Sequence, residues 1–383
     1  MAGRRCAKLK PSQRDKKPAT APLIIAARWQ FRDNRDMDEP APIDPAATAH
    51  RVDRLTRLLG LGALALLGVT WKLWTPQNVF PRVPLLYWAP PHWLDWTSIA
   101  VVVVGLLGLI VHRRVPERRT AAGLAAGGFA LQFLADQHRL QPWAWQFFIL
   151  ALVIALADDR SILVGWRWLV ISIYAYSALS KLDYAFTRNV GTLLTEQYWQ
   201  LRNLSPAFAK PTPLVYSLQT YAPFFLPVGE LLVAILLWRP RTRRYGLWGS
   251  WLMHLGLLGL LGPFGLNHSF GVLLWNAFFV FQNWMLFGDR FVDAGNRQPK
   301  SCRHIAERAN LVARGVLVIA YIWPALYPLG LCDAWIGWAV YSAPFERVSI
   351  WLNRESADSL RQSGNDALSR SLRGPGFDNT SVK

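Results

Sequence analysis

Apolar segments long enough to cross a bilayer recur through most of this chain, and short arginine-rich loops separate them. A transmembrane helix needs about 20 mostly apolar residues, because the hydrocarbon core of a bilayer is about 30 Å thick. Of the 383 residues, 52% are hydrophobic, and the apolar runs are too long for the core of a soluble domain. The pattern predicts an all-α fold, a polytopic integral membrane helix bundle.

Nine segments are predicted to be spanning helices from their length and hydrophobicity. They are residues 57–74, 96–112, 120–135, 142–157, 162–186, 221–238, 245–262, 268–288 and 311–330. The third is rich in small residues, and Gly123, Gly127 and Gly128 are expected to permit close helix packing there.

Basic residues in the loops predict how these helices are oriented. Arg113 and Arg114 follow the second segment and Arg243 and Arg244 follow the sixth, whereas loops after odd-numbered segments carry few basic residues. Cytoplasmic loops of membrane proteins are enriched in Lys and Arg. The distribution therefore predicts an N-terminus inside and a C-terminus outside, and we expect the membrane to be the plasma (inner) membrane of a bacterium.

Polar tails flank the predicted helices. Residues 1–54 are predicted to be a disordered, basic cytoplasmic tail, and residues 55–330 to form the transmembrane helical domain. Residues 331–354 carry many aromatic side chains and are predicted to be an interfacial aromatic segment. Residues 355–383 are rich in Ser, Arg, Asn and Gly and are predicted to be a second disordered tail.

The formal net charge of +18 does not predict a nucleic-acid partner. The basic residues lie mainly in the N-terminal tail and in alternate loops, and no nucleic-acid-binding motif accompanies them. The expected partner is the lipid bilayer. The three cysteines are far apart and no ligand cluster has metal-site spacing, so neither a structural disulfide nor a metal site is predicted.

Costly polar residues lie within four consecutive apolar segments. Tyr174, Ser177 and Lys181 share one face of the fifth segment at helical spacing, and Glu230 lies near the middle of the sixth. His254 is central in the seventh segment, and the eighth carries a polar stripe made of Ser269, Asn276 and Asn283. Because ionisable residues at membrane depth usually face protein or a cavity, these side chains predict a shared polar cavity that binds a small amphiphilic ligand.

Each of these residues also has a structural explanation. Lys181 is close enough to the predicted interface to anchor the helix there by extending its amine into water. Glu230 and the Asn stripe are also suited to helix–helix hydrogen bonds, and His254 to a packed core position. A buried Lys181 is a usable base unless Glu230 or Asp183 holds its charge. A second polar cluster, Asp136, His138 and Arg139, lies at the same outer end, where an ordinary charged hairpin is the alternative.

Several short motifs carry a resemblance to a known membrane family. Ser-Ala-Leu-Ser-Lys-Leu-Asp-Tyr at 177–184, followed by Gly191, resembles the lysine-containing segment of the vitamin K-dependent γ-carboxylase/HTTM family and of the related DoxX/MauE proteins. The resemblance continues, in the same order as in the family, over roughly residues 55–290. It includes Gln-His-Arg-Leu at 137–140, Ala-Asp-Asp-Arg at 157–160, Val-Gly-Glu-Leu-Leu at 228–232, and Met-His-Leu and Gly-Pro-Phe within 253–264.

The resemblance implies a chemistry for two of these residues. In the carboxylase a lysine deprotonates vitamin K hydroquinone and a histidine assists, and the matching positions are Lys181 and His138. A quinone or hydroquinone is the implied cofactor. The chain departs from the enzyme in having one lysine instead of a pair, Gln137 where the family has Asn, and about 50 residues in place of a large C-terminal domain. These departures argue against γ-glutamyl carboxylation itself.

Two functional hypotheses follow, and the sequence leaves open whether the protein is an enzyme. In the first, a quinol- or lipid-like ligand binds in the cavity and Lys181 acts as a base, with Glu230, His254, Tyr174, Ser177, Asn276 and Asn283 lining it. In the second, the protein is a non-catalytic transporter or an accessory subunit of a membrane redox or maturation complex, and the same residues hold the bundle together.

Overall fold

The computed structural model describes residues 45–76, 82–86, 90–183, 186–187, 190–195, 213–288 and 303–340, without the side chains of 213–220 and 303–309. Residues 1–44 of the predicted N-terminal tail, residues 341–354 of the aromatic segment and the whole predicted tail at 355–383 lie outside these ranges. The described residues all belong to one compact unit.

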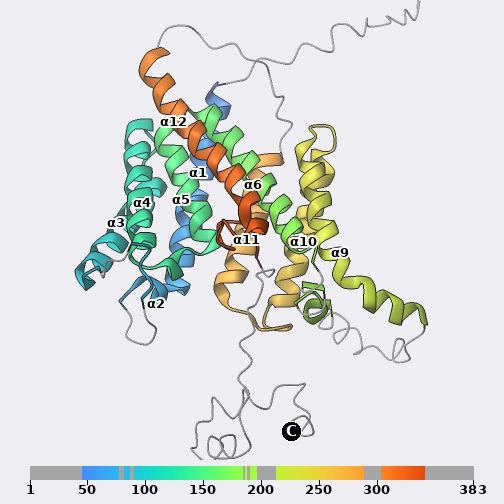
Figure 1. The fold of residues 1–383 in the computed structure, drawn as a ribbon. Coiled ribbons are helices and arrows are strands. Elements are labelled where there is room, and N and C mark those ends of the chain that lie inside the picture. Colours follow the sequence, from blue (N-terminus) through green and yellow to red (C-terminus); the bar gives the residue numbers. More distant parts are fainter. Residues whose placement is uncertain are drawn as a thin grey trace, which may run out of the picture. The chain divides into compact units, whose positions relative to one another are not determined.

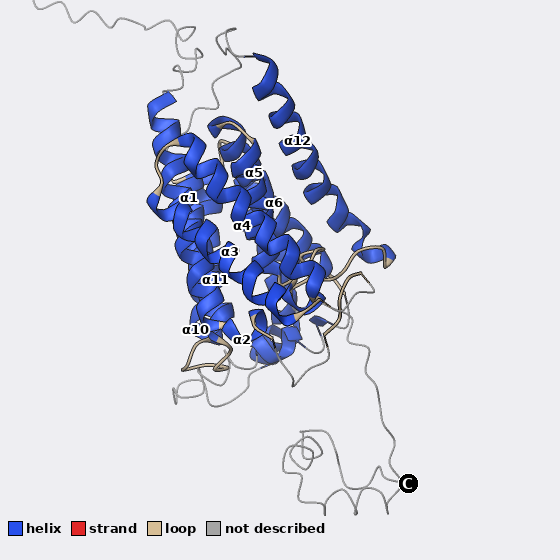
Figure 2. Ribbon diagram, turned by 90° about the vertical axis from the view of Figure 1, so that its left-hand side faces the viewer, coloured by secondary structure: helices blue, strands red, loops and turns tan. Residues whose placement is uncertain are grey.

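Every regular element among the described residues is a helix, as the sequence predicts (Figures 1 and 2). The elements are α1 Pro45–Val69, α2 Trp71–Trp74, α3 His92–Val111, α4 Val115–Ala135, η2 Gln137–Arg139, α5 Pro142–Leu156, α6 Asp159–Ser180, α9 Pro213–Trp238, α10 Arg243–Leu261, α11 Phe270–Phe287, α12 Arg303–Ile322 and η4 Trp323–Leu329. Each of the nine predicted segments overlaps one of the long helices.

Five of the described helical stretches are long and apolar enough to cross a membrane: His92–Val111, Asp159–Ser180, Tyr221–Trp238, Phe270–Phe287 and Asn310–Leu329. These stretches mark the chain as an integral membrane protein. The helix α5, with 15 residues, is apolar but shorter. Outward-facing side chains are apolar as well, for example Leu252 on α10, which is 78% exposed.

The first helix begins earlier than the sequence analysis predicts. α1 starts at Pro45, so residues 45–54 belong to a helix and not to a disordered tail. Proline suits the first position of a helix, where a missing N–H costs nothing. Thr48, Val52, Leu55 and Leu59 form a buried stripe at helical spacing. The arginines between them hide this stripe when hydrophobicity is averaged over a window.

The last predicted span also differs from the structure at its end. The segment 311–330 is not one α-helix, because α12 ends at Ile322 and a 3₁₀ helix continues to Leu329. Pro324 and Pro328 explain the change, since proline cannot donate the backbone hydrogen bond that an α-helix needs. Gly330 closes the element in the left-handed conformation, with φ of 71°.

Beyond that turn, Cys332 gives a testable pH dependence. Burial, together with the nearby Asp333 carboxylate, raises the pKa of the Cys332 thiol to about 11. Because the thiolate is the reactive form, alkylation should be slow at pH 8 and its rate should rise about tenfold per pH unit up to about pH 11. The measurement is iodoacetamide labelling of a Cys6→Ser/Cys302→Ser variant. A rate that levels off near pH 9, as for a free thiol, would contradict the prediction.

Helices α3 and α4 approach closely through small residues. A Cβ added at Gly105 of α3 would lie 2.7 Å from the backbone oxygen of Ala121, and one at Gly128 of α4 would lie 2.9 Å from the backbone oxygen of Ser98. Of the three glycines predicted to permit packing, Gly128 therefore does so. Gly123 and Gly127 have nothing within 4 Å of an added Cβ, so they face open space.

This contact makes Gly105→Ala a sharp test of the α3–α4 packing. The added methyl group meets backbone atoms that cannot rotate away, so we expect a loss of about 1–3 kcal/mol in stability. Gly123→Ala is the matched control, and it should be neutral or stabilise the helix by up to about 1 kcal/mol. Thermal unfolding in detergent measures both variants; equal melting temperatures would show that the helices are not tightly packed at Gly105.

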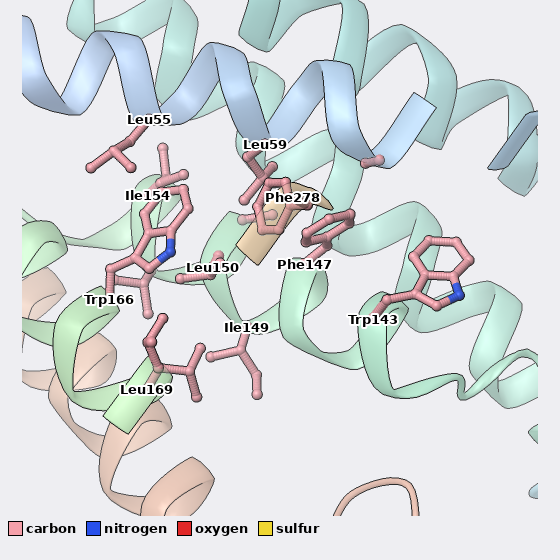
Figure 3. Packing of buried hydrophobic residues seen from close by; sticks show 14 of the residues in the cluster. Leu55, Leu59, Trp143, Phe147, Ile149, Leu150, Ile154, Trp166, Leu169 and Phe278 are labelled. Carbon is pink, nitrogen blue, oxygen red and sulfur yellow. The ribbon is translucent and has the colours of Figure 1, made fainter. Parts of the chain in front are cut away.

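The apolar core joins α1, α5, α6 and α11 (Figure 3). Phe147 of α5 meets Phe278 of α11 edge to face, with ring centroids 4.8 Å apart. Further members of this cluster are Leu55, Leu59, Ile149, Leu150, Ile154, Trp166 and Leu169. The core positions α6 and α11, whose polar faces turn toward α9 and α10 on the other side.

Candidate functional site

A cavity of about 430 Å³ lies among α6, α9, α10, α11 and the start of α5. Its walls are mainly apolar and aromatic, with Trp143, Phe186, Leu226, Met253, Leu257, Trp275, Phe279 and Trp335 among the lining residues. The polar lining includes Tyr174, Ser177, Lys181, Glu230, His254 and Asn276. The structure thus brings together six of the eight residues that the sequence analysis selects.

The charged part of the lining is an ion pair between α9 and the C-terminal end of α6. Lys181 Nζ donates to both carboxylate oxygens of Glu230, each at 2.8 Å, and to Ser177 Oγ at 2.6 Å. The Lys181 side chain is 6% exposed and that of Glu230 is 13% exposed. Lys181 is therefore held inside the protein by Glu230 and does not extend its amine to the interface as an anchor.

The neutral part of the lining is a hydrogen-bond chain across α6, α10 and α11. Asn283 Nδ2 donates to the Tyr174 hydroxyl at 2.6 Å, and that hydroxyl lies 2.6 Å from His254 Nε2. His254 Nδ1 lies 2.8 Å from Asn276 Oδ1, and Asn276 Nδ2 donates to the Val272 carbonyl at 2.9 Å.

The contacts of this chain suit a neutral His254. The amide nitrogen of Asn276 donates to a carbonyl, so its oxygen faces His254 and accepts a hydrogen bond from Nδ1–H. With the Nδ1 hydrogen used on Asn276, Nε2 of a neutral ring can accept from the Tyr174 hydroxyl, which itself accepts from Asn283. His254 is a neutral imidazole in this arrangement, and its ring stacks on Phe279 with centroids 4.8 Å apart.

The remaining two predicted site residues lie elsewhere. Asn283 does not line the cavity but stands behind Tyr174, fully buried. His138 lies in η2, lines a second cavity of about 330 Å³ and is 52% exposed. Asp136 holds it there, since its Oδ1 accepts from the His138 backbone N–H at 3.1 Å and lies 2.9 Å from Nδ1. Gln141 lines both cavities.

The sequence analysis does not predict the buried charge cluster around Asp95. Asp95 is fully buried on α3, and its two oxygens each lie 2.6 Å from an arginine, Arg139 on one side and Arg82 on the other. Arg139 also donates to Gln132 Oε1 at 2.5 Å and to the Leu73 carbonyl at 3.1 Å. The sequence signal for Asp95 is an acidic residue directly beside an apolar run. The predicted helix begins at residue 96, so it does not include Asp95.

Buried glutamines form a second group that the sequence analysis does not single out. Gln282 Oε1 accepts from Gln146 Nε2 at 3.1 Å and from Trp166 Nε1 at 3.0 Å. Trp275, which lines the main cavity, donates to Gln146 Oε1 at 2.9 Å. This network ties one wall of the cavity to the core of α5 and α6.

Comparison with protein-family models, with curated proteins and with solved structures gives no match. The family resemblance remains a prediction from the motifs. Within the described ranges, no group of three or more His, Cys, Asp or Glu side chains could hold a metal ion.

Proposed function

We propose that this protein binds an uncharged amphiphile of the quinol or lipid-like class, with its polar head in the main cavity. The observation that carries the proposal is the lining of the main cavity. Its walls are apolar and aromatic, and they carry both the Lys181–Glu230 ion pair and the hydrogen-bond chain through His254. Its volume of about 430 Å³ suits a small ligand, and such sites usually have apolar walls with a few placed polar groups.

The charges of the lining favour an uncharged head group. Lys181 and Glu230 neutralise each other, and His254 is neutral in its hydrogen-bond chain. A charged head group would find no unpaired countercharge on these residues, and burying an unpaired charge is costly. The motif resemblance supports a hydroquinone as the ligand, and a quinol-dependent enzyme of the γ-carboxylase-like superfamily is the enzymatic form of this proposal.

A structural role is the second candidate, and a specific observation favours it. The ion pair joins α6 to α9, and the neutral chain joins α6, α10 and α11. Helices that are linked in this way suit a non-catalytic transporter or an accessory subunit of a membrane complex. In that case removal of these residues would cost stability without any effect on the affinity for a ligand.

We also propose nine spans with the N-terminus inside and the C-terminus outside, in the plasma membrane of a bacterium. A helix at each of the nine predicted segments and the alternating arginine loops support this topology. Reporter fusions that are active on only one side of the membrane would test it. Reporters inserted in residues 239–242 and in residues 263–267 should give opposite results.

Ligand binding is tested with the purified protein in lipid nanodiscs. A short-chain alkyl hydroquinone should quench tryptophan fluorescence saturably, because Trp143, Trp275 and Trp335 line the cavity. Met253→Phe puts a rigid ring in the wall of the cavity and narrows it, which should weaken binding at least about tenfold. Leu252→Phe, on the adjacent exposed position, is the matched control and should bind like the wild type. Equal binding by both variants, or quenching no greater than that of free tryptophan in empty nanodiscs, would overturn the proposal.

A further inference from the structure

All hydrogen-bond donors of the Lys181 ammonium group are in use. An ammonium group has three N–H donors and no acceptor. Its three partners are Ser177 Oγ and the two oxygens of Glu230, all within 2.8 Å. Lys181 therefore has no N–H left for a ligand, and it could act as a base only by giving up its contact with the carboxylate.

Glu230 keeps hydrogen-bonding capacity that Lys181 lacks. A carboxylate has about four lone-pair sites, and Lys181 uses one on each oxygen. The Glu230 side chain is also the more exposed of the pair, 13% against 6%, and both residues line the cavity. The carboxylate is therefore the charged group that a head group in the cavity can reach.

The neutral chain has no such bias toward accepting hydrogen bonds. The Tyr174 hydroxyl has no capacity left for a ligand, because His254, Asn283 and Ser250 are all hydrogen-bond partners of it. Asn276 Oδ1 has a second lone pair beyond the one that accepts from His254. Asn276 Nδ2 has one N–H beyond its bond to Val272, so the neutral chain has one acceptor and one donor to spare, and the preference for a hydrogen-bond donor rests on Glu230.

We propose that Glu230 is the residue that receives the ligand, as acceptor for a hydroxyl group, and that Lys181 is a positioning residue that acts through it. The site then selects uncharged heads that donate a hydrogen bond over heads that only accept one. This inference rests on the proposed function, and it assigns to Glu230 the direct contact that the motif resemblance assigns to Lys181.

Three probes of the same tail length test the assignment in nanodiscs: 4-octylphenol, 4-octylanisole and 4-octylbenzoate. The phenol donates a hydrogen bond, the anisole only accepts one, and the benzoate carries a negative charge. Because a hydrogen bond to a charged group is among the stronger ones, we expect the phenol to bind at least about tenfold more tightly than either of the others. This comparison uses the wild-type protein and needs no variant to fold.

Variants then separate the two members of the pair. Glu230→Gln should bring the phenol-to-anisole affinity ratio close to one, because an amide both donates and accepts. Lys181→Met should lower the phenol-to-anisole affinity ratio. Lys181→Arg, which can still orient the carboxylate, should keep the ratio near that of the wild type. A purely structural pair would change the affinities for both probes alike and leave their ratio unchanged.

Each outcome has one meaning. Anisole or benzoate binding as tightly as phenol to the wild type, or a ratio unaffected by Glu230→Gln, overturns this inference and leaves the proposed function standing. Binding of none of the three probes and no hydroquinone binding overturns the proposed function as well. Leu252→Phe, on the exposed face of α10, should keep the wild-type ratio.

Discussion

Replacing Lys181 by methionine is expected to destabilise the folded protein by roughly 3 kcal/mol, while Lys181→Met/Glu230→Leu recovers most of that loss. The single change leaves a mostly buried carboxylate without its partner, and an unpaired buried charge costs more than the pair contributes. The double change removes both charges. Because the cavity gives Glu230 partial exposure, the effect should fall at the low end of the range for buried pairs.

Unfolding in mixed detergent micelles measures the three proteins, and Lys181→Arg serves as the charge-conserving control. The double variant also separates the two candidate functions. If the pair is mainly a link between α6 and α9, the double variant should still bind the hydroquinone probe. If the pair receives the ligand, the double variant should fold and lose binding. A Lys181→Met protein as stable as the wild type would show that the ion pair is not formed in the membrane.

Asp95→Asn is the substitution with the largest expected effect on folding. Asp95 is the carboxylate between Arg139 and Arg82, and the change leaves Arg139, 2% exposed, with a buried positive charge that has lost its ion pair. We expect a loss of about 3–5 kcal/mol, which is a large part of the roughly 5–15 kcal/mol by which native proteins are stable.

Asp53→Asn is the matched control for this prediction. It makes the same chemical change in a partly exposed pair with Arg57 on α1, where a loss below about 1 kcal/mol is expected. The yield of monodisperse protein and the melting temperature measure both variants. Similar values for the two variants would show that Asp95 is less buried, or less charged, than its surroundings indicate.

Much of the fold and of the candidate site follows from periodicity within single helices. Apolar length predicts the long helices, and helical spacing puts Tyr174, Ser177 and Lys181 on one face of α6, where the cavity lies. Glu230, His254 and Asn276 could be selected in the same way, because each is a polar side chain that an apolar helix would not otherwise contain.

Pairing between distant residues could not be predicted in this way. Asp95 and Arg139 are 44 residues apart, and neither residue alone indicates its partner. His138 resembles a site residue by motif, yet the Asp136 side chain holds it in a different cavity. The sequence analysis does not predict the start of α1 for a related reason. Arginines on one face of the helix lower its average hydrophobicity and so conceal the buried stripe on the other face.

The length of chain between hydrogen-bonded partners has a consequence for biogenesis. Tyr174 is synthesised 80 residues before His254 and 109 residues before Asn283. Lys181 is synthesised 49 residues before Glu230. Proteins are synthesised at about 5–20 residues per second, so α6 enters the membrane seconds before its polar partners exist. During that interval its lysine, tyrosine and serine need other partners, from lipid head groups, water or the insertion machinery. Nascent chains that stop after α6 should therefore stay bound to that machinery, and release should follow the synthesis of α11.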